Sequence, residues 1–156
     1  MVGCKACAGP PAASGALLAF VATRLTAMRA PELDLYPEYV HVRVNEEKPT
    51  EALCALLRRA TEQCVEKSLL GAVWELRSSS LSVCLAIAGA LDAMADLWRG
   101  SQRRLALLCA DPAAQGACWY AALLAERRGV PLQSFYDEPA ALEWLVGPGA
   151  VPGRFA

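Results

Sequence analysis

The fold of this chain is decided by a short apolar run at residues 105–109, Leu-Ala-Leu-Leu-Cys, which follows Arg103-Arg104 and is closed by Asp111-Pro112. A continuous apolar run of this length is typical of a strand covered on both faces, as the inner strands of a parallel sheet are. Asp111 and the proline after it suit the first turn of a helix, because the acid can accept free backbone N–H groups. The run therefore predicts a strand that leads directly into a helix.

The same change from strand pattern to helix pattern recurs on both sides of this run. Strands are predicted at residues 33–36, 39–44, 72–76, 105–109 and 132–136, and helices at about 50–64, 81–98, 112–128 and 139–146. The first two strands are joined by a tight turn and form a hairpin, so the element order is β-β-α-β-α-β-α-β-α. Alternating strands and helices imply parallel strands joined by right-handed crossovers. The fold class expected is α/β, with a small mixed, largely parallel sheet of four to five strands and about four helices.

The length of 156 residues fits one domain with its own core. We assign residues 32–147 to this domain, residues 1–31 to an N-terminal leader and residues 148–156 to a C-terminal tail. The leader is interpreted as disordered or as a misassigned start, with Met28 as an alternative first residue. Its apolar stretch at residues 16–22 is shorter than the roughly 20 residues that span a bilayer. A helix packed on the domain and an export signal stay open as alternatives.

Charge and cysteine content restrict the partners. A net charge of -1 and a pI near 5.9 give no basic excess of the kind that binds nucleic acid or acidic membranes. Seven cysteines, five of them within apolar runs, are typical of buried thiols in a reducing compartment, so a cytoplasmic location is expected. Cys4 and Cys7 have the spacing of half a zinc site or of a redox dithiol, yet no matching zinc ligands follow, and the pair does not follow a strand and open a helix as a thioredoxin-like dithiol does. No metal and no cofactor are predicted.

The loop with Ser78, Ser79 and Ser80 is the first candidate site. It follows a predicted parallel strand, and the carboxyl ends of such strands form the ligand-facing edge of a sheet. Its hydroxyls could cap the next helix, bind an anion or accept a phosphate. Asp111 and Asp137 begin later helices at the same edge, where they could cap those helices or hold Mg²⁺. We favour capping for both acids.

Other polar residues are given structural roles. His41 lies in the 39–44 strand on the face opposite Val40, Val42 and Val44, so it is expected to face solvent. The basic pairs 103–104 and 127–128 are interpreted as solvated, or as charges favourable to a helix end. Glycine-rich phosphate loops are absent from the sequence, and no nucleophile, base and orienting group assemble from it. The chain is therefore predicted not to be an enzyme.

The closing part of the chain carries a family resemblance. Residues 120–129, followed by residues 135–145 with the pattern D-x-x-x-A-L-x-W-L from Asp137 to Leu145, resemble a helix, strand and final helix of the STAS-like proteins related to the SpoIIAA anti-sigma factor antagonists. The resemblance covers residues 32–147. It implies a bacterial regulatory domain that docks to a kinase or switch protein under control of serine phosphorylation. Related groups bind lipid or nucleotide.

The resemblance departs from the family at the serine loop. Antagonists carry an Asp-Ser-Ser/Thr-Gly type motif after the equivalent strand, whereas this chain has Arg77-Ser78-Ser79-Ser80, without the aspartate and the glycine. The leading hypothesis is a non-enzymatic cytoplasmic interaction domain with a protein partner. The alternative is a small-ligand or lipid-binding module that uses Trp74, Trp98 and Trp119. Exposed aromatic residues could also pair two copies in a homodimer.

Overall fold

The structure is a computed structural model that describes residues 32–45 and 47–147. Predictions about the leader, including Cys4 and Cys7, and about the C-terminal tail concern positions outside these ranges. Everything below refers to the described domain.

The elements follow the predicted order. They are β1 (Leu33–Leu35), β2 (Tyr39–Val44), α2 (Thr50–Glu66), β3 (Gly71–Leu76), α3 (Leu81–Leu97), β4 (Arg104–Cys109), the 3-10 turn η1 (Pro112–Ala114), α4 (Gln115–Arg128), β5 (Leu132–Phe135) and α5 (Glu138–Val146). The α/β class is therefore confirmed, and the boundaries agree with the sequence pattern to within a few residues.

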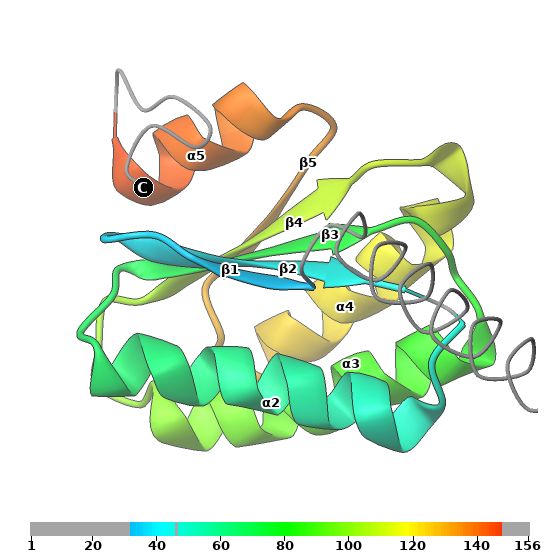
Figure 1. Ribbon diagram of the computed structural model, residues 1–156, viewed down its shortest axis with the longest axis horizontal. Helices are drawn as coiled ribbons and strands as arrows, with labels where there is room; N and C mark the ends of the chain where they lie inside the picture. Colours follow the sequence, from blue (N-terminus) through cyan, green and yellow to red (C-terminus); the bar gives the residue numbers. More distant parts are fainter. Residues whose placement is uncertain (1–31, 46, 148–156) are drawn as a thin grey trace, which may run out of the picture. The chain divides into compact units, whose positions relative to one another are not determined.

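The five strands form one sheet in the order β1-β2-β3-β4-β5, with β1 antiparallel to β2 and the other neighbours parallel. Each crossover steps one strand further in the same direction. Right-handed crossovers of this kind place their helices on one face of the sheet. Figure 1 shows this arrangement, with α2, α3 and α4 on one face and α5 on the other.

The face under α2, α3 and α4 carries the main core. The strands contribute alternate side chains to it, among them Val42, Trp74 and Leu107, all fully buried. The helices α2 and α3 approach closely, because Gly89 faces Cys54 and presents no side chain there. Trp98, just after α3, donates a hydrogen bond from its indole Nε1 to the backbone oxygen of Thr61 in α2 at 3.3 Å. The three helices therefore form one layer that packs on the sheet.

The opposite face is covered by α5 through a second, smaller core. Tyr39, Val73, Ala106 and Leu108 of the strands pack there with α5 residues such as Leu142. Strand β2 is consequently buried on both faces. The prediction of a strand buried on one face was wrong for this reason, because alternation in the sequence does not reveal whether a later helix covers the second face.

Within the part of the chain that the structure describes, no helix has both the length and the apolar character needed to cross a membrane.

Candidate functional site

The serine loop lies between β3 and α3 at the carboxyl edge of the sheet, as predicted. The Ser79 hydroxyl donates a hydrogen bond to the backbone oxygen of Ala113 at 2.6 Å and accepts one from the backbone N–H of Ala117 at 2.9 Å. Ser79 itself is exposed. It therefore ties the loop to η1 and to the first turn of α4 while its side chain can still be reached from solvent.

The other two serines stabilise the loop and the start of α3. The Ser80 hydroxyl accepts a hydrogen bond from the backbone N–H of Val83 at 3.3 Å and so caps α3. The Ser78 hydroxyl accepts one from the backbone N–H of Ser80 at 3.0 Å, and its side chain is nearly buried. Of the three candidates, Ser79 is the one that connects two elements.

Asp111 and Asp137 both act as helix caps. Asp111 accepts a hydrogen bond from the backbone N–H of Ala113 at 2.8 Å, and Asp137 accepts one from that of Ala140 at 3.2 Å. Asp111 lies near Ser79, since both contact Ala113, whereas Asp137 begins α5 on the other face of the sheet. No group of three or more potential metal ligands occurs among the described residues. Neither acid forms part of a cation site there.

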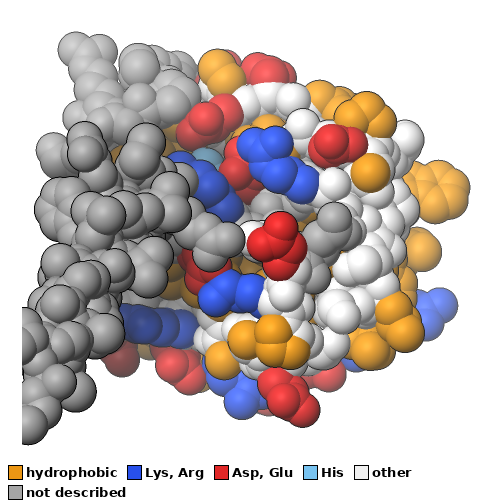
Figure 2. Space-filling model, turned by 45° about the vertical axis from the view of Figure 1, so that its right-hand side comes forward, with side chains coloured by type: hydrophobic (Ala, Val, Ile, Leu, Met, Phe, Trp, Pro, Cys, Tyr) orange, Lys and Arg blue, Asp and Glu red, His pale blue; other side chains and the backbone are white. Residues whose placement is uncertain are grey.

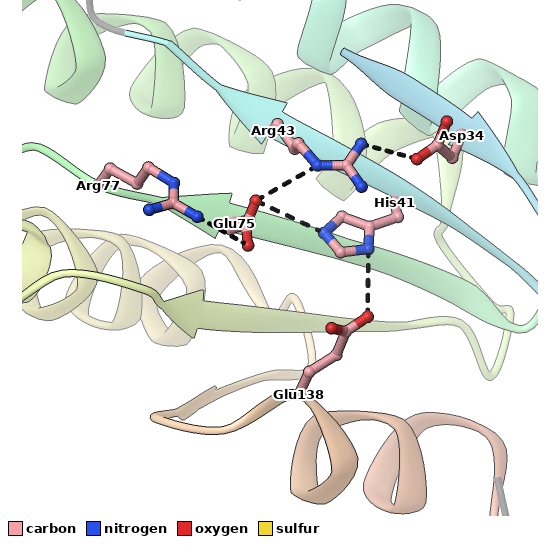
Figure 3. A network of polar contacts seen from close by, with 6 residues as sticks. All are labelled: Asp34, His41, Arg43, Glu75, Arg77 and Glu138. Carbon is pink, nitrogen blue, oxygen red and sulfur yellow. Dashed lines mark hydrogen bonds and ion pairs between the residues drawn. The ribbon is translucent and has the colours of Figure 1, made fainter. Parts of the chain in front are cut away.

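A cluster of charged side chains that the sequence did not predict lies on the α5 face. Figure 3 shows Arg43 between Asp34 and Glu75, with His41 beside Glu75 and pointing toward Glu138. The guanidinium of Arg43 donates to Asp34 at 2.7 Å and lies 3.6 Å from Glu75. Arg77 lies 3.5 Å from the other oxygen of Glu75. The cluster joins β1, β2 and β3 across the sheet.

His41 is the buried member of this cluster, with only 3% of its side chain exposed. Its Nε2 lies 4.0 Å from Glu75, and its Nδ1 lies 3.7 Å from Glu138 at the start of α5. The prediction that His41 faces solvent was therefore wrong. It does lie on the face opposite the valines, but α5 covers that face.

The electrostatics of the cluster favour a neutral His41 near pH 7. Burial lowers the pKa of His41 below its usual value and outweighs the opposing effect of the Glu75 carboxylate. Burial also acts to lower the pKa of Arg43, but its hydrogen bond and charge interaction with Asp34 raise that pKa overall. A neutral imidazole has one N–H to donate, so it cannot serve two carboxylates at once.

The geometry of the cluster indicates a structural contact between the sheet and α5 rather than a catalytic pair. Neither His41 Nε2 nor the Glu75 oxygen that faces it has a hydrogen-bond partner within the described domain. Their separation of 4.0 Å exceeds the range of about 2.6–3.2 Å in which a base and its orienting acid cooperate. The arrangement places the buried imidazole of His41 between Glu75 of the sheet and Glu138 in the first turn of α5.

The thiols of the domain are free. Burial raises the pKa of Cys64 to about 12, and burial together with its neighbour Cys109 raises the pKa of Cys118 to about 12. Thiols with such values carry almost no thiolate at neutral pH and are poor nucleophiles. The prediction of buried thiols is confirmed for Cys64, Cys109 and Cys118.

An exposed apolar surface lies on the outer side of α3 and α4, next to the serine loop. It consists of five large side chains with exposed fractions between 37% and 77%, namely Leu81, Leu85, Trp119, Tyr120 and Leu123, and we refer to it as the α3–α4 surface. Trp119 and Leu123 also line a shallow hollow of about 200 Å³. Figure 2 shows one face of the molecule, on which exposed hydrophobic side chains lie among charged side chains of both signs.

The sequence contained a signal for this surface. Leu81 and Leu85 are four residues apart, as are Trp119 and Leu123, so each pair lies on one side of its helix, away from the stripe that packs on the sheet. The three tryptophans considered as a ligand site do not share a surface. Trp74 and Trp98 are buried, whereas Trp119 is 77% exposed.

Comparisons with known proteins add no relative. A scan against protein-family models, a search of curated proteins and a search of solved structures found no match to this chain. The STAS-like resemblance stays a prediction.

Proposed function

We propose that this chain is a non-enzymatic regulatory domain that binds another protein through the α3–α4 surface. One observation carries the proposal. Five large apolar side chains are exposed on the two adjacent helices α3 and α4, whereas five of the seven exposed residues of α2, in the same layer, are charged: Glu51, Arg58, Arg59, Glu62 and Glu66. Clustered exposed apolar side chains are typical of an interaction site.

The composition of the surface suits a protein partner. Burying one large apolar side chain contributes about 1.5–3 kcal/mol, and tryptophan and tyrosine are enriched among the residues that dominate interface energies. Charged residues border the surface, including Glu126, Arg127 and the ion pair between Asp92 and Arg128. An apolar centre with a charged rim is the usual composition of such an interface. The resemblance to STAS-like proteins supports a kinase or switch protein as the partner.

The serine loop gives this surface a means of control. A phosphate on Ser79 would add nearly two negative charges and remove the hydroxyl proton that Ser79 donates to Ala113. The hydrogen bonds of Ser79 connect the loop before α3 to the start of α4. We therefore propose that phosphorylation at Ser79 changes how α3 and α4 sit side by side, and with them the docking surface.

Site-specific photo-crosslinking tests the docking surface. A photoreactive amino acid is placed at Trp119 and, as a matched control, at Arg59 on the exposed side of α2. In the cells that make the protein, position 119 should give a discrete adduct that position 59 lacks. The partner, identified by mass spectrometry and purified, should bind the wild type, and its affinity should fall at least about tenfold with Trp119→Ser or Leu123→Ser.

Three results would contradict the proposal. They are equal adducts from both positions, unchanged affinity in the serine variants, and an adduct that contains only a second copy of this chain. Light scattering of the purified protein distinguishes the last case, because a dimer doubles the measured mass.

A further inference from the structure

A second recess lies at the opposite edge of the sheet, where β3 and β4 begin, on the left in Figure 1. Two hollows of about 350 Å³ and about 200 Å³ meet there and share Leu70 and Gln102 in their linings. Arg104 and Trp144 line the larger hollow, and Arg103 lines the smaller one. We call this recess the amino-edge groove. It is separate from the serine loop, which lies at the carboxyl edge.

Two consecutive arginines at this edge direct their side chains toward different helices, Arg103 toward α2 and Arg104 toward α5. Arg103 donates a hydrogen bond from Nε to the backbone oxygen of Cys64, at the end of α2, at 3.2 Å. Arg104 donates one to the backbone oxygen of Trp144 in α5 at 3.0 Å and lies 5.4 Å from the centre of the Trp144 ring. Carbonyl oxygens and an aromatic face orient a guanidinium without cancelling its charge.

Neither arginine has an acidic partner within the described domain. Arg43, Arg77, Arg99 and Arg128 each form an ion pair with a carboxylate, whereas Arg103 and Arg104 form none there, as is also true of the α2 pair Arg58 and Arg59. Glu143 belongs to the lining of the larger hollow but forms no ion pair with Arg103 or Arg104. Each guanidinium carries five N–H donors, of which one is used here. Most of their donors therefore stay open to a ligand.

The residues that the two hollows share are one apolar side chain, Leu70, and one polar side chain, Gln102. Leu70 lies in both hollows and is 46% exposed, and the Trp144 side chain borders the larger hollow. Guanidinium groups bind carboxylate and phosphate oxygens in pairs of parallel hydrogen bonds. We propose that the amino-edge groove binds a small amphiphilic anion, a carboxylate or phosphate monoester whose apolar part covers Leu70. This site goes beyond the proposed docking function and does not depend on it.

Nuclear magnetic resonance titration of the full chain tests the site, with hexyl phosphate and hexanoate as probes. Saturable shifts are expected at the backbone amides of Leu70 and Gln102 and at the indole N–H of Trp144. Hexanol and inorganic phosphate, which each lack one half of the ligand chemistry, should bind more weakly. The double variant Arg103→Gln/Arg104→Gln should lose at least about tenfold in affinity, as expected when charged hydrogen bonds are removed.

A matched control uses another pair of consecutive arginines, Arg58 and Arg59 in α2, which are both exposed and have no ion-pair partner in the described domain. Arg58→Gln/Arg59→Gln changes the net charge equally and should leave the affinity unchanged. Because Arg104→Gln could loosen α5, the single variant Arg103→Gln is measured too, and thermal unfolding verifies that each variant is folded. Equal losses in both double variants, or an unchanged affinity after Arg103→Gln/Arg104→Gln, would overturn the proposal.

Vesicles that contain phosphatidic acid identify the source of the anion. Cosedimentation that depends on the two arginines, together with binding of hexyl phosphate, indicates a lipid headgroup. Binding of the soluble probes without cosedimentation indicates a free organic anion. Cosedimentation without any binding of soluble probes would overturn an enclosed site in the groove.

Discussion

The two faces of the sheet are covered in different ways. Three helices of 17, 17 and 14 residues pack on one face, and α5, with nine residues, packs on the other. Among residues 32–45 and 47–147, the first face buries 27 apolar residues in one cluster, while the second buries seven and adds the charged cluster around His41 and Glu75. The helical layer therefore supplies most of the apolar stabilisation, and the α5 face holds a buried histidine, His41, whose burial lowers its pKa.

This difference separates two possible roles within one small domain. The α3–α4 surface, which we propose for docking, lies on the outer side of the helical layer. Its side chains can be substituted without changing the charged cluster on the α5 face. The α5 face depends on charge and on a short helix, so it should respond to pH and open more easily. Each prediction below tests one side of this contrast, in order of expected effect on stability.

The largest loss is expected from Leu107→Ala. Leu107 is fully buried between the sheet and the helical layer, so its truncation leaves a cavity in the main core. Such changes cost about 2–5 kcal/mol in the free energy of unfolding. Urea unfolding measured by circular dichroism should show one cooperative transition at a lower midpoint. A loss below about 1 kcal/mol would show that this layer is not the main source of stability.

Leu142→Ala makes the same truncation under α5. Leu142 is also fully buried, but it belongs to the smaller cluster. Because α5 can detach locally, we expect a smaller loss of global stability, about 1–3 kcal/mol, and faster hydrogen exchange in α5. Exchange in α2 and α3 should change little. Equal acceleration in all helices would mean that the two faces unfold as one unit.

The helical layer could be predicted from the sequence, and the α5 face only in part. The apolar residues of β2 occur at every second position, namely Val40, Val42 and Val44. Those of α2 recur every three or four residues, namely Leu53, Leu57, Ala60 and Cys64. Each local pattern therefore predicts which side of its element is buried. His41 was assigned to the correct side of β2, but its burial depends on a helix almost 100 residues later. Local periodicity contains no information about such a contact.

The pH dependence of stability should come from the α5 face. The lowered pKa of His41 means that the unfolded chain binds its proton more readily than the folded one. Stability should therefore fall as the pH decreases below about 6.5, the ordinary value for histidine. His41→Asn should remove this contribution, which is read as the difference between the two proteins in urea midpoints from about pH 7.5 to about pH 5.5.

The surroundings of His41 define the opposite result. Glu75 and Glu138 favour its protonated form, whereas burial and Arg43 oppose it. If the wild type gained stability relative to His41→Asn on acidification, the two carboxylates would outweigh burial. The cluster would then be a charged triad near neutral pH.

Ser79→Ala tests the connection between the serine loop and α4. It removes two hydrogen bonds, to Ala113 and from Ala117, and should cost about 1 kcal/mol in the free energy of unfolding. Ser82→Ala is the control, since Ser82 lies one turn away in α3 without a side-chain hydrogen bond in the described structure. Thermal unfolding should separate the two variants. Equal melting temperatures would show that Ser79 does not tie the helices together.

The serine loop also shows how far a site can be inferred from sequence. Position was predictable, because Ser78, Ser79 and Ser80 follow a strand and precede a helix. The sequence did not predict which serine connects two elements. The partner atoms of Ser79 belong to residues 113 and 117, which lie in η1 and α4, more than 30 residues further along the chain. In the sequence, Trp119 and Leu123 could be recognised only as two apolar residues one helical turn apart. That spacing occurs on buried and on exposed faces of helices, so it did not predict their exposure.

The smallest effect on stability is expected from Trp119→Ser, on the outer side of the helical layer. Trp119 is 77% exposed, so its replacement should change the free energy of unfolding by no more than about 0.5 kcal/mol. The same substitution should reduce partner binding at least about tenfold, because a tryptophan at the centre of an interface contributes far more to binding than to folding. Measured together, unfolding midpoint and affinity distinguish a docking surface from a part of the core. A loss of stability comparable to that of Leu107→Ala would place Trp119 in the packed layer, and the contrast between the inner and outer sides of that layer would no longer hold.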